Sequence, residues 1–125
     1  MHRILFLLKK EEVNIMAELA EMKCIPCQGG IPPLTPDQIK PYMEKLGNSW
    51  KLAYSHHIEK TFEFKTFAQS MEFTNKVAEL AEEEGHHPEI HVSFRKVKLE
   101  FWTHKIDGLH ESDFVMAAKV DRLLS

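Results

Sequence analysis

The segment Gly85-His86-His87-Pro88 stands where the hydrophobic pattern of this chain changes its period, and it limits the folds that the chain can adopt. Before it, apolar residues recur at helical spacing, which predicts a helix over residues 66–84. After it, apolar and polar residues alternate, as in strands with one buried face. Glycine ends many helices in a left-handed conformation, and a proline soon after it prevents the helix from continuing. We therefore expect a stiff corner between helix and strand, with two histidines on it.

The other hydrophobic patterns complete one order of elements. They predict a helix over residues 36–46, strands over 50–54 and 58–64, strands over 90–94 and 97–103, and a helix over 112–124. Thr35 and Gln38 can form a capping box at the start of the first helix. His56-His57 is expected to form the two-residue turn of the first hairpin. The order α-β-β-α-β-β-α predicts an α+β fold, an antiparallel four-stranded sheet with three helices on one face.

Strand parity separates the two faces of the last predicted strand. The inward set is Val97, Leu99, Phe101 and Thr103, and the outward set is Lys98, Glu100, Trp102 and His104. His104 is therefore expected on the open face of the sheet, away from the helices. Trp102 beside it would form a stacking surface or a subunit interface.

Length and composition place the chain in a broad class. Its 125 residues correspond to one domain, which we place at residues 34–125, after an N-terminal extension and Cys/Gly/Pro-rich loop over residues 1–33. A net charge of −3 provides no basic face for nucleic acid. The apolar run at residues 4–8 is too short for a membrane span or a signal-peptide core. Two cysteines do not make a disulfide framework, so a cytoplasmic location is expected.

The histidines of the corner, together with His104, indicate proton-transfer chemistry, because histidine changes its charge near neutral pH. Glu82 lies in the last turn of the predicted helix, where the helix dipole disfavours negative charge. Its carboxylate would favour the imidazolium form of a neighbouring histidine and orient its ring. The alternative is that the acidic residues 82–84 are only a solvated helix end.

The spacing Cys24-x-x-Cys27 is compatible with half of a zinc site or with a redox pair. A zinc site would usually have a second closely spaced pair of ligands, and the adjacent His86 and His87 bind one metal together awkwardly. A redox motif would usually follow a strand and open a helix, whereas this segment is a proline-bounded loop. We therefore expect no metal.

The motifs of the chain resemble those of the pterin-4a-carbinolamine dehydratases over about residues 34–124. They are Glu82-x-x-x-His86-His87-Pro88-Glu89, Lys96-Val97, Thr103-His104-x-x-x-Gly108-Leu109 and Asp113. The resemblance implies the same helix-hairpin-helix-hairpin-helix fold. It also implies dehydration of 4a-hydroxytetrahydropterin to quinonoid dihydropterin and water, without cofactor or metal. This reaction recycles the pterin that aromatic amino-acid hydroxylases use.

The same resemblance implies a role for each site residue. The catalytic residues would be His86, His87 and His104. The substrate-binding residues would be Trp50, Glu82, Pro88, Thr103, Lys105 and Asp113. Glu82 and Asp113 would hold the histidines, and which histidine is the acid and which the base stays open.

The chain departs from the family pattern at two positions. Ile90 stands where many members have a tryptophan, so one wall of the site would be weaker. His110 replaces the serine that usually caps the last helix, which leaves Ser112 or a frayed turn as the expected cap.

The resemblance also implies partners. They are a pterin substrate, one or three further copies of the chain in a homodimer or homotetramer, and functional coupling to an aromatic amino-acid hydroxylase. From the charge and the short apolar run, no nucleic acid and no membrane are expected as partners. The alternative is a non-enzymatic dimerisation or interaction module of the same fold, because animal members also act as dimerisation partners of a homeodomain transcription factor. The retained histidines favour the enzyme.

Overall fold

The computed structural model describes residues 18–24 and 29–124. In chain order its elements are α2 (Pro36–Lys45), η1 (Gly47–Ser49), β1 (Lys51–Ala53), β2 (His57–Glu63), α3 (Phe67–Glu84), β3 (Glu89–Val92), β4 (Lys96–Phe101), η2 (His104–Ile106) and α4 (Glu111–Arg122). The predicted order of helices and strands is confirmed. Residues 18–21 are also helical. The expectations for residues 1–17 and for Cys27 lie outside the described residues.

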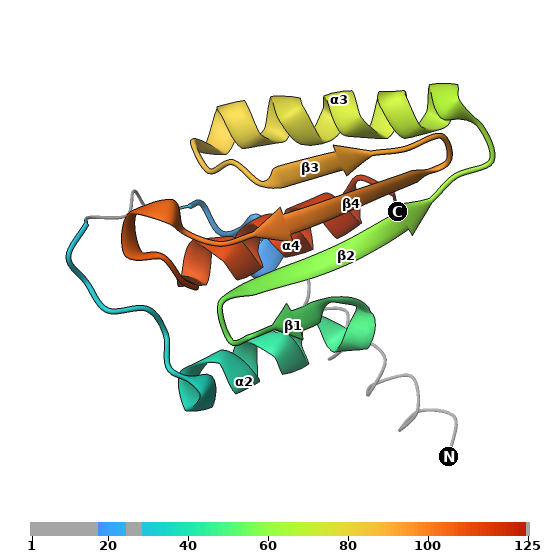
Figure 1. The fold of residues 1–125 in the computed structure, drawn as a ribbon. Helices are drawn as coiled ribbons and strands as arrows, with labels where there is room; N and C mark the ends of the chain where they lie inside the picture. The colour runs from blue at the N-terminus through green and yellow to red at the C-terminus, as the bar shows by residue number, and fades with distance from the viewer. Residues whose placement is uncertain (1–17, 25–28, 125) are drawn as a thin grey trace, which may run out of the picture.

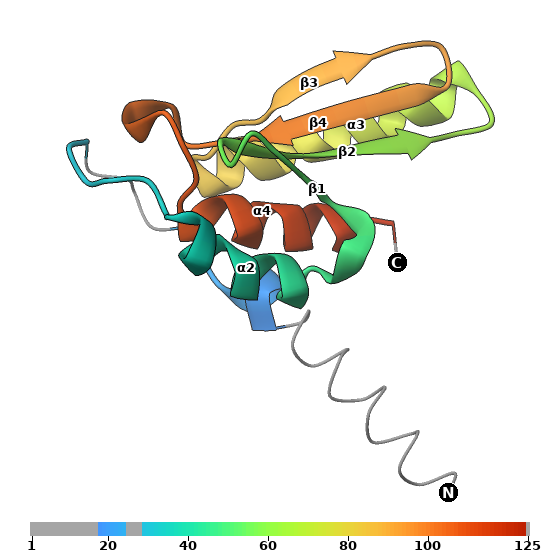
Figure 2. The same cartoon turned by 60° about the horizontal axis from the view of Figure 1, so that its bottom comes forward.

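The four strands form one antiparallel sheet in the order β1-β2-β4-β3. Figure 1 shows α4 passing behind β4, with α3 above it and α2 below it. Figure 2 shows α2 and α4 beneath the strands, so that the helices cover one face and leave the other open. The fold is therefore α+β, as predicted. In the described part of the chain, no helix combines the length and hydrophobicity that a membrane crossing requires.

The alternation of β4 confirms the predicted parity. Val97, Leu99 and Phe101 have no exposed surface and pack against the helices. Lys98 and Glu100 point to the open face, where Lys98 lies 3.3 Å from a carboxylate oxygen of Glu100. Because β4 lies between β2 and β3, its inward side chains form the centre of the core.

Local signals explain where the helices begin and end. Thr35 and Gln38 form the predicted capping box of α2. Thr66 caps α3 by accepting a hydrogen bond from the backbone N–H of Gln69 at 3.1 Å. Gly85 ends α3 with φ 64° and ψ 29°, a left-handed conformation that a glycine adopts without steric cost.

The prediction for the first hairpin turn is wrong. Tyr54 and Ser55 form the turn, with φ of 55° and 54°, and His56 N–H closes it on the carbonyl of Ala53 at 3.0 Å. Two left-handed residues in succession give the turn whose twist matches that of the strands. His57 is therefore the first residue of β2, and Tyr54 is 95% exposed instead of buried.

Part of the predicted N-terminal extension belongs to the core. Leu19 is 2% exposed and Ala20 is 5% exposed. Lys119 of α4 donates to the carbonyl of Ala20 at 2.8 Å and lies 3.2 Å from Glu84 at the end of α3. The domain boundary at residues 33 and 34 remains a prediction.

Candidate active site

At the corner after α3, the side chains of His86 and His87 point in different directions. The backbone N–H of His86 donates to the carbonyl of Ala81 at 3.1 Å, so the chain turns back on the last helical turn. Pro88 follows directly, and β3 begins at Glu89. The side chain of His86 is 13% exposed and that of His87 is 59% exposed. One imidazole therefore lies against the core and the other lies in solvent.

Asp113 is a buried carboxylate that joins three segments of the chain. It has no exposed surface. Its Oδ1 lies 2.5 Å from Nε2 of His86, and its Oδ2 accepts from the hydroxyl of Thr103 and from the N–H of His110, both at 2.9 Å. A buried charge is tolerated when it is hydrogen-bonded in this way. Because a carboxylate only accepts, His86 donates through Nε2, and Nδ1 is the acceptor when the ring is neutral.

His87 is paired with Glu82. Its Nε2 lies 2.9 Å from Oε1 of Glu82, whose side chain is 80% exposed. An exposed pair of this kind contributes little to the stability of the fold. It does orient the imidazole, which is the role expected of Glu82.

The loop after β4 carries Thr103 and His104. Thr103 is buried and forms an isolated bridge with Gly108, donating its N–H to the Gly108 carbonyl at 2.8 Å. His104 is exposed, and its ring centroid lies 4.4 Å from that of Trp102 on the open side of the sheet. Lys105 is exposed within η2. His104 belongs to η2 and not to β4, which ends at Phe101, so strand parity does not determine its position; its contact with Trp102 does.

Apart from Trp50, the candidate site residues lie on segments at one end of the molecule. Both Figure 1 and Figure 2 place the corner after α3, the η2 loop and the start of α4 at the same end. Asp113 forms hydrogen bonds with both His86 and Thr103. His104 is joined to them through the backbone of Thr103, while its own ring packs on Trp102.

Trp50, which lies between η1 and β1, contacts the C-terminal part of α4. It is 3% exposed, and its indole N–H donates to Asp121 at 2.9 Å. Asp121 follows Asp113 by roughly two helical turns, a separation of about 12 Å. The roles of Trp50 and of Pro88 toward a substrate remain predictions.

The start of α4 corrects one expectation. His110 itself is the cap: its Nδ1 accepts from the N–H of Ser112 at 3.4 Å, and its own N–H donates to Asp113. An imidazole nitrogen with a lone pair can replace the serine hydroxyl as the acceptor. Neither Ser112 nor a frayed turn is needed.

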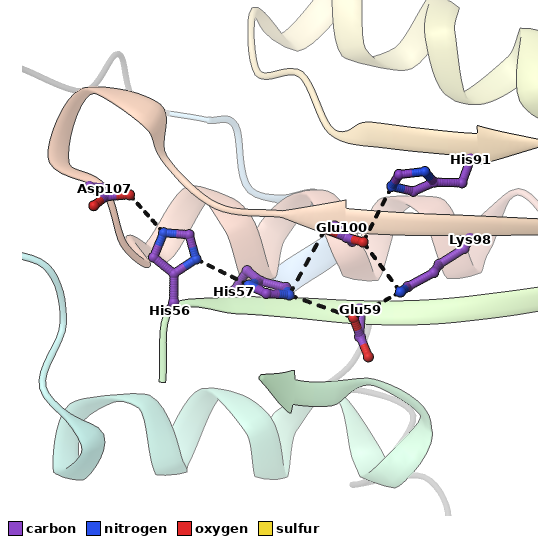
Figure 3. A network of polar contacts seen from close by, with 7 residues as sticks. All are labelled: His56, His57, Glu59, His91, Lys98, Glu100 and Asp107. Carbon is purple, nitrogen blue, oxygen red and sulfur yellow. Dashed lines mark hydrogen bonds and ion pairs between the residues drawn. The ribbon is translucent and has the colours of Figure 1, made fainter. Parts of the chain in front are cut away.

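Sequence reasoning missed a network on the open face, drawn in Figure 3. We call it the open-face network; it consists of His56, His57, Glu59, His91, Lys98, Glu100 and Asp107. The register places Glu59 directly opposite Glu100, which would repel it without a cation between them. Lys98 lies 3.4 Å from Glu59 and 3.3 Å from Glu100, and hydrogen bonds to Glu100 and Glu59 raise the pKa of its ammonium group. Had His57 been assigned to the strand and not to the turn, the alternation of β2 would have put it on the same face as Glu59.

Cys24 is a partly buried thiol that contacts the start of α4. Its Sγ donates to the carbonyl of Ser112 at 3.8 Å. Burial, followed by the negative charge of Glu84, raises the pKa of Cys24 to about 11. The thiol is therefore protonated at neutral pH. Within residues 18–24 and 29–124, no three potential ligands are arranged to hold a metal ion.

A groove of about 580 Å³ lies away from these residues. It is lined by the end of β2, the first turns of α3 and Leu124. His86 lies beyond the opposite end of α3. The groove therefore does not include the candidate site.

Comparisons with known proteins identify the family. Residues 32–123 match the family model described as pterin 4 alpha carbinolamine dehydratase. A protein from Alkaliphilus metalliredigens, assigned by its name to the pterin-4-alpha-carbinolamine dehydratases, is 54% identical over 107 residues, which are 86% of this chain and 96% of that protein. A similarly named protein from Rickettsia bellii is 48% identical over 111 residues, 89% of this chain and 98% of that one.

Two solved structures are similar as well. The transcriptional coactivator/pterin dehydratase from Brucella melitensis has a TM-score of 0.69 at 28% identity, over 74% of this chain and 99% of that chain. A pterin dehydratase-like protein described as a RuBisCO assembly factor in the alpha-carboxysome has a TM-score of 0.53 at 29% identity, over 62% of this chain and 92% of that chain. With the family model covering the whole sheet and its helices, this chain belongs to the pterin 4 alpha carbinolamine dehydratase family.

Proposed function

We propose that this chain dehydrates 4a-hydroxytetrahydropterin to quinonoid dihydropterin and water. The observation that carries the proposal is the buried carboxylate of Asp113, which holds His86 and Thr103 at once. Family membership supplies the substrate class. The three histidines that the family resemblance singles out belong to the corner after α3 and to η2, two segments that lie at the same end of the fold.

The proposed reaction needs one acid and one base. The acid protonates the 4a-hydroxyl group, which leaves as water with the electron pair of the C–O bond. The electron pair of the neighbouring ring nitrogen forms the C=N bond, and the base removes the proton of that nitrogen. Proton transfer by positioned histidines typically accelerates such steps by about 10²–10⁴.

We assign the residues as follows. His86, His87 and His104 are the catalytic and pterin-contacting groups, with Asp113 orienting His86 and Glu82 orienting His87. Trp50, Pro88, Thr103 and Lys105 complete the proposed substrate-binding set. The proposed setting is cytoplasmic, as a homodimer or homotetramer coupled to an aromatic amino-acid hydroxylase that produces the carbinolamine.

The test generates the 4a-carbinolamine with an aromatic amino-acid hydroxylase and follows its dehydration. We expect acceleration by the wild-type protein, and a loss of about 10²-fold in kcat for His87→Ala and for His104→Ala. His91→Ala is a matched control, because the side chain of His91 is also 59% exposed and also pairs with a glutamate. Unchanged rates in both His87→Ala and His104→Ala would contradict the assignment.

A second function has one observation in its favour. The carboxysomal neighbour has the same fold and is described as an assembly factor. A non-enzymatic interaction module would not require the histidines. A folded wild-type protein that gives no acceleration in the dehydration assay would favour this alternative.

A further inference from the structure

The turn between β1 and β2 is tied to the loop that carries His104. Nε2 of His56 lies 2.8 Å from Oδ1 of Asp107, a contact between residues 51 positions apart in the sequence. Figure 3 shows the two side chains pointing toward one another from the hairpin turn and from the loop. Asp107 ends η2 in a left-handed conformation, with φ 48° and ψ 49°, and donates its N–H to the carbonyl of His104 at 3.3 Å. Asp107 therefore connects His56 to the backbone of His104.

The same segments are joined through aromatic rings. The indole of Trp102 lies 4.4 Å from the ring of His104, 5.4 Å from that of His56 and 5.8 Å from that of His57, measured between centroids. Three imidazoles thus surround one indole. The ring of His104 rests on Trp102, and Trp102 is in turn held by the two histidines of the hairpin.

The hydrogen bonds define the tautomer of His56. The carboxylate of Asp107 can only accept, so Nε2 of His56 donates to it. Nδ1 of His56 lies 3.1 Å from Nδ1 of His57 and accepts from it when the ring of His56 is neutral. Both ring nitrogens of His56 are engaged, which leaves its imidazole few alternative orientations.

We propose that His56 is a positioning residue that, through Asp107 and Trp102, holds His104 in its catalytic orientation. The inference rests on the proposed function, in which His104 contacts the pterin. Catalytic groups lose much of their effect when their orientation is not maintained. The side chain of Asp107 is 88% exposed, so its pair with His56 adds little to folding stability, and its effect is on the orientation of the loop.

The test compares variants in the dehydration assay. We expect His56→Ala to lower kcat about tenfold while KM changes less than about twofold, because a positioning contact acts on the catalytic step. Gln can present an amide N–H close to the place of the imidazole Nε2, so His56→Gln is expected to recover most of the rate. Asp107→Gly keeps the left-handed conformation, removes the acceptor of the His56 hydrogen bond, and is expected to lower kcat as His56→Ala does. His91→Ala again serves as the control.

A double mutant separates positioning from a general structural effect. In the His104→Ala background, removal of His56 should produce no further loss, because the group that it positions is gone. Full additivity of the two losses would overturn the proposal. So would a loss in His56→Ala that His56→Gln does not reduce.

A readout independent of activity keeps the two proposals distinguishable. The ring of Trp102 should shift the proton resonances of the His104 ring in the NMR spectrum of the wild-type protein. We expect these shifts to move toward random-coil values in His56→Ala and to be retained in His91→Ala. If the wild-type protein accelerates no dehydration, the proposed function fails, and the NMR comparison alone decides whether His56 positions His104. Unchanged His104 resonances in His56→Ala would overturn the positioning.

Discussion

Asp113 accepts hydrogen bonds from His86, Thr103 and His110 without any exposed surface, so its charge matters for both stability and orientation. Asp113→Asn keeps the shape of the side chain but replaces one acceptor oxygen by an NH₂ donor. We expect a loss of about 1.5–3 kcal/mol in the free energy of unfolding and a fall in kcat. Urea denaturation and the dehydration assay measure the two effects.

Thr103→Val is the matched comparison for that variant. It removes one hydrogen bond to Asp113 and keeps the side-chain volume, so a smaller loss of about 1 kcal/mol is expected. If Asp113→Asn were as stable and as active as wild type, the carboxylate would not be the anchor of the site.

Cys24 gives a prediction about pH. Its pKa is raised from 9.0 to about 11 by burial and by Glu84, so folding favours the protonated thiol. This contribution to stability is complete below pH 9 and is lost as the pH rises toward 11. At pH 8 the thiolate fraction, and with it the rate of alkylation by iodoacetamide, should be roughly 100-fold lower than for an ordinary cysteine.

The alkylation is measured in a Cys27→Ser background, so that only Cys24 reacts. The same protein unfolded in urea provides the rate of the accessible thiol. A folded protein that reacts at the unfolded rate would show that Cys24 is neither buried nor perturbed.

At the scale of elements, the η2 loop depends on a close approach between the backbone of Gly108 and the side chain of Pro33. A Cβ added at Gly108 would lie 2.5 Å from Cβ of Pro33, a distance that requires one of them to move. Gly108→Ala should therefore cost about 1–3 kcal/mol and lower kcat, because the loop holds His104. Gly29→Ala is the control, since nothing lies within 4 Å of its added Cβ. Equal urea midpoints for the two variants would contradict this account.

Elements with a strong local signal could be predicted from the sequence. Residues 67–84 have both a helical period and a left-handed glycine at the end, and β4 has a strict alternation. The first hairpin could not be placed correctly, because Tyr54 and Ser55 adopt positive φ without the glycine or asparagine that usually indicates such a turn.

In the candidate site, too, features with a local sequence signal could be predicted and features that depend on the tertiary fold could not. Strand parity placed Lys98 and Glu100 on the open face, but it does not reach His104, which lies in η2 beyond the end of β4. The hydrogen bond between His86 and Asp113 depends on packing between α3 and α4 and was expected only from the family resemblance. The contact of His56 with Asp107 joins two turns that no local pattern relates. Long-range polar contacts of this kind arise from the tertiary fold and have no periodicity of their own.

At the scale of the whole molecule, residues 18–24 connect to the last helix. Leu19 is buried in the same core cluster as Phe114 and Val120. Lys119 links the carbonyl of Ala20 to Glu84, so this segment, α3 and α4 meet at one partly buried ion pair. We infer that the cooperative folding unit extends N-terminal to residue 34.

Leu19→Ala tests this extent of the folding unit. Truncation of a fully buried leucine typically costs about 2–5 kcal/mol, and we expect a loss within this range in the free energy of unfolding, with an unchanged urea m-value. Glu18→Ala is the matched control, because Glu18 precedes Leu19 in the helical residues 18–21 and is exposed. If Leu19→Ala and Glu18→Ala unfolded at the same urea concentration as wild type, the segment would lie outside the cooperative unit. The boundary would then fall at residue 34, as the glycine and proline content of the preceding loop predicts.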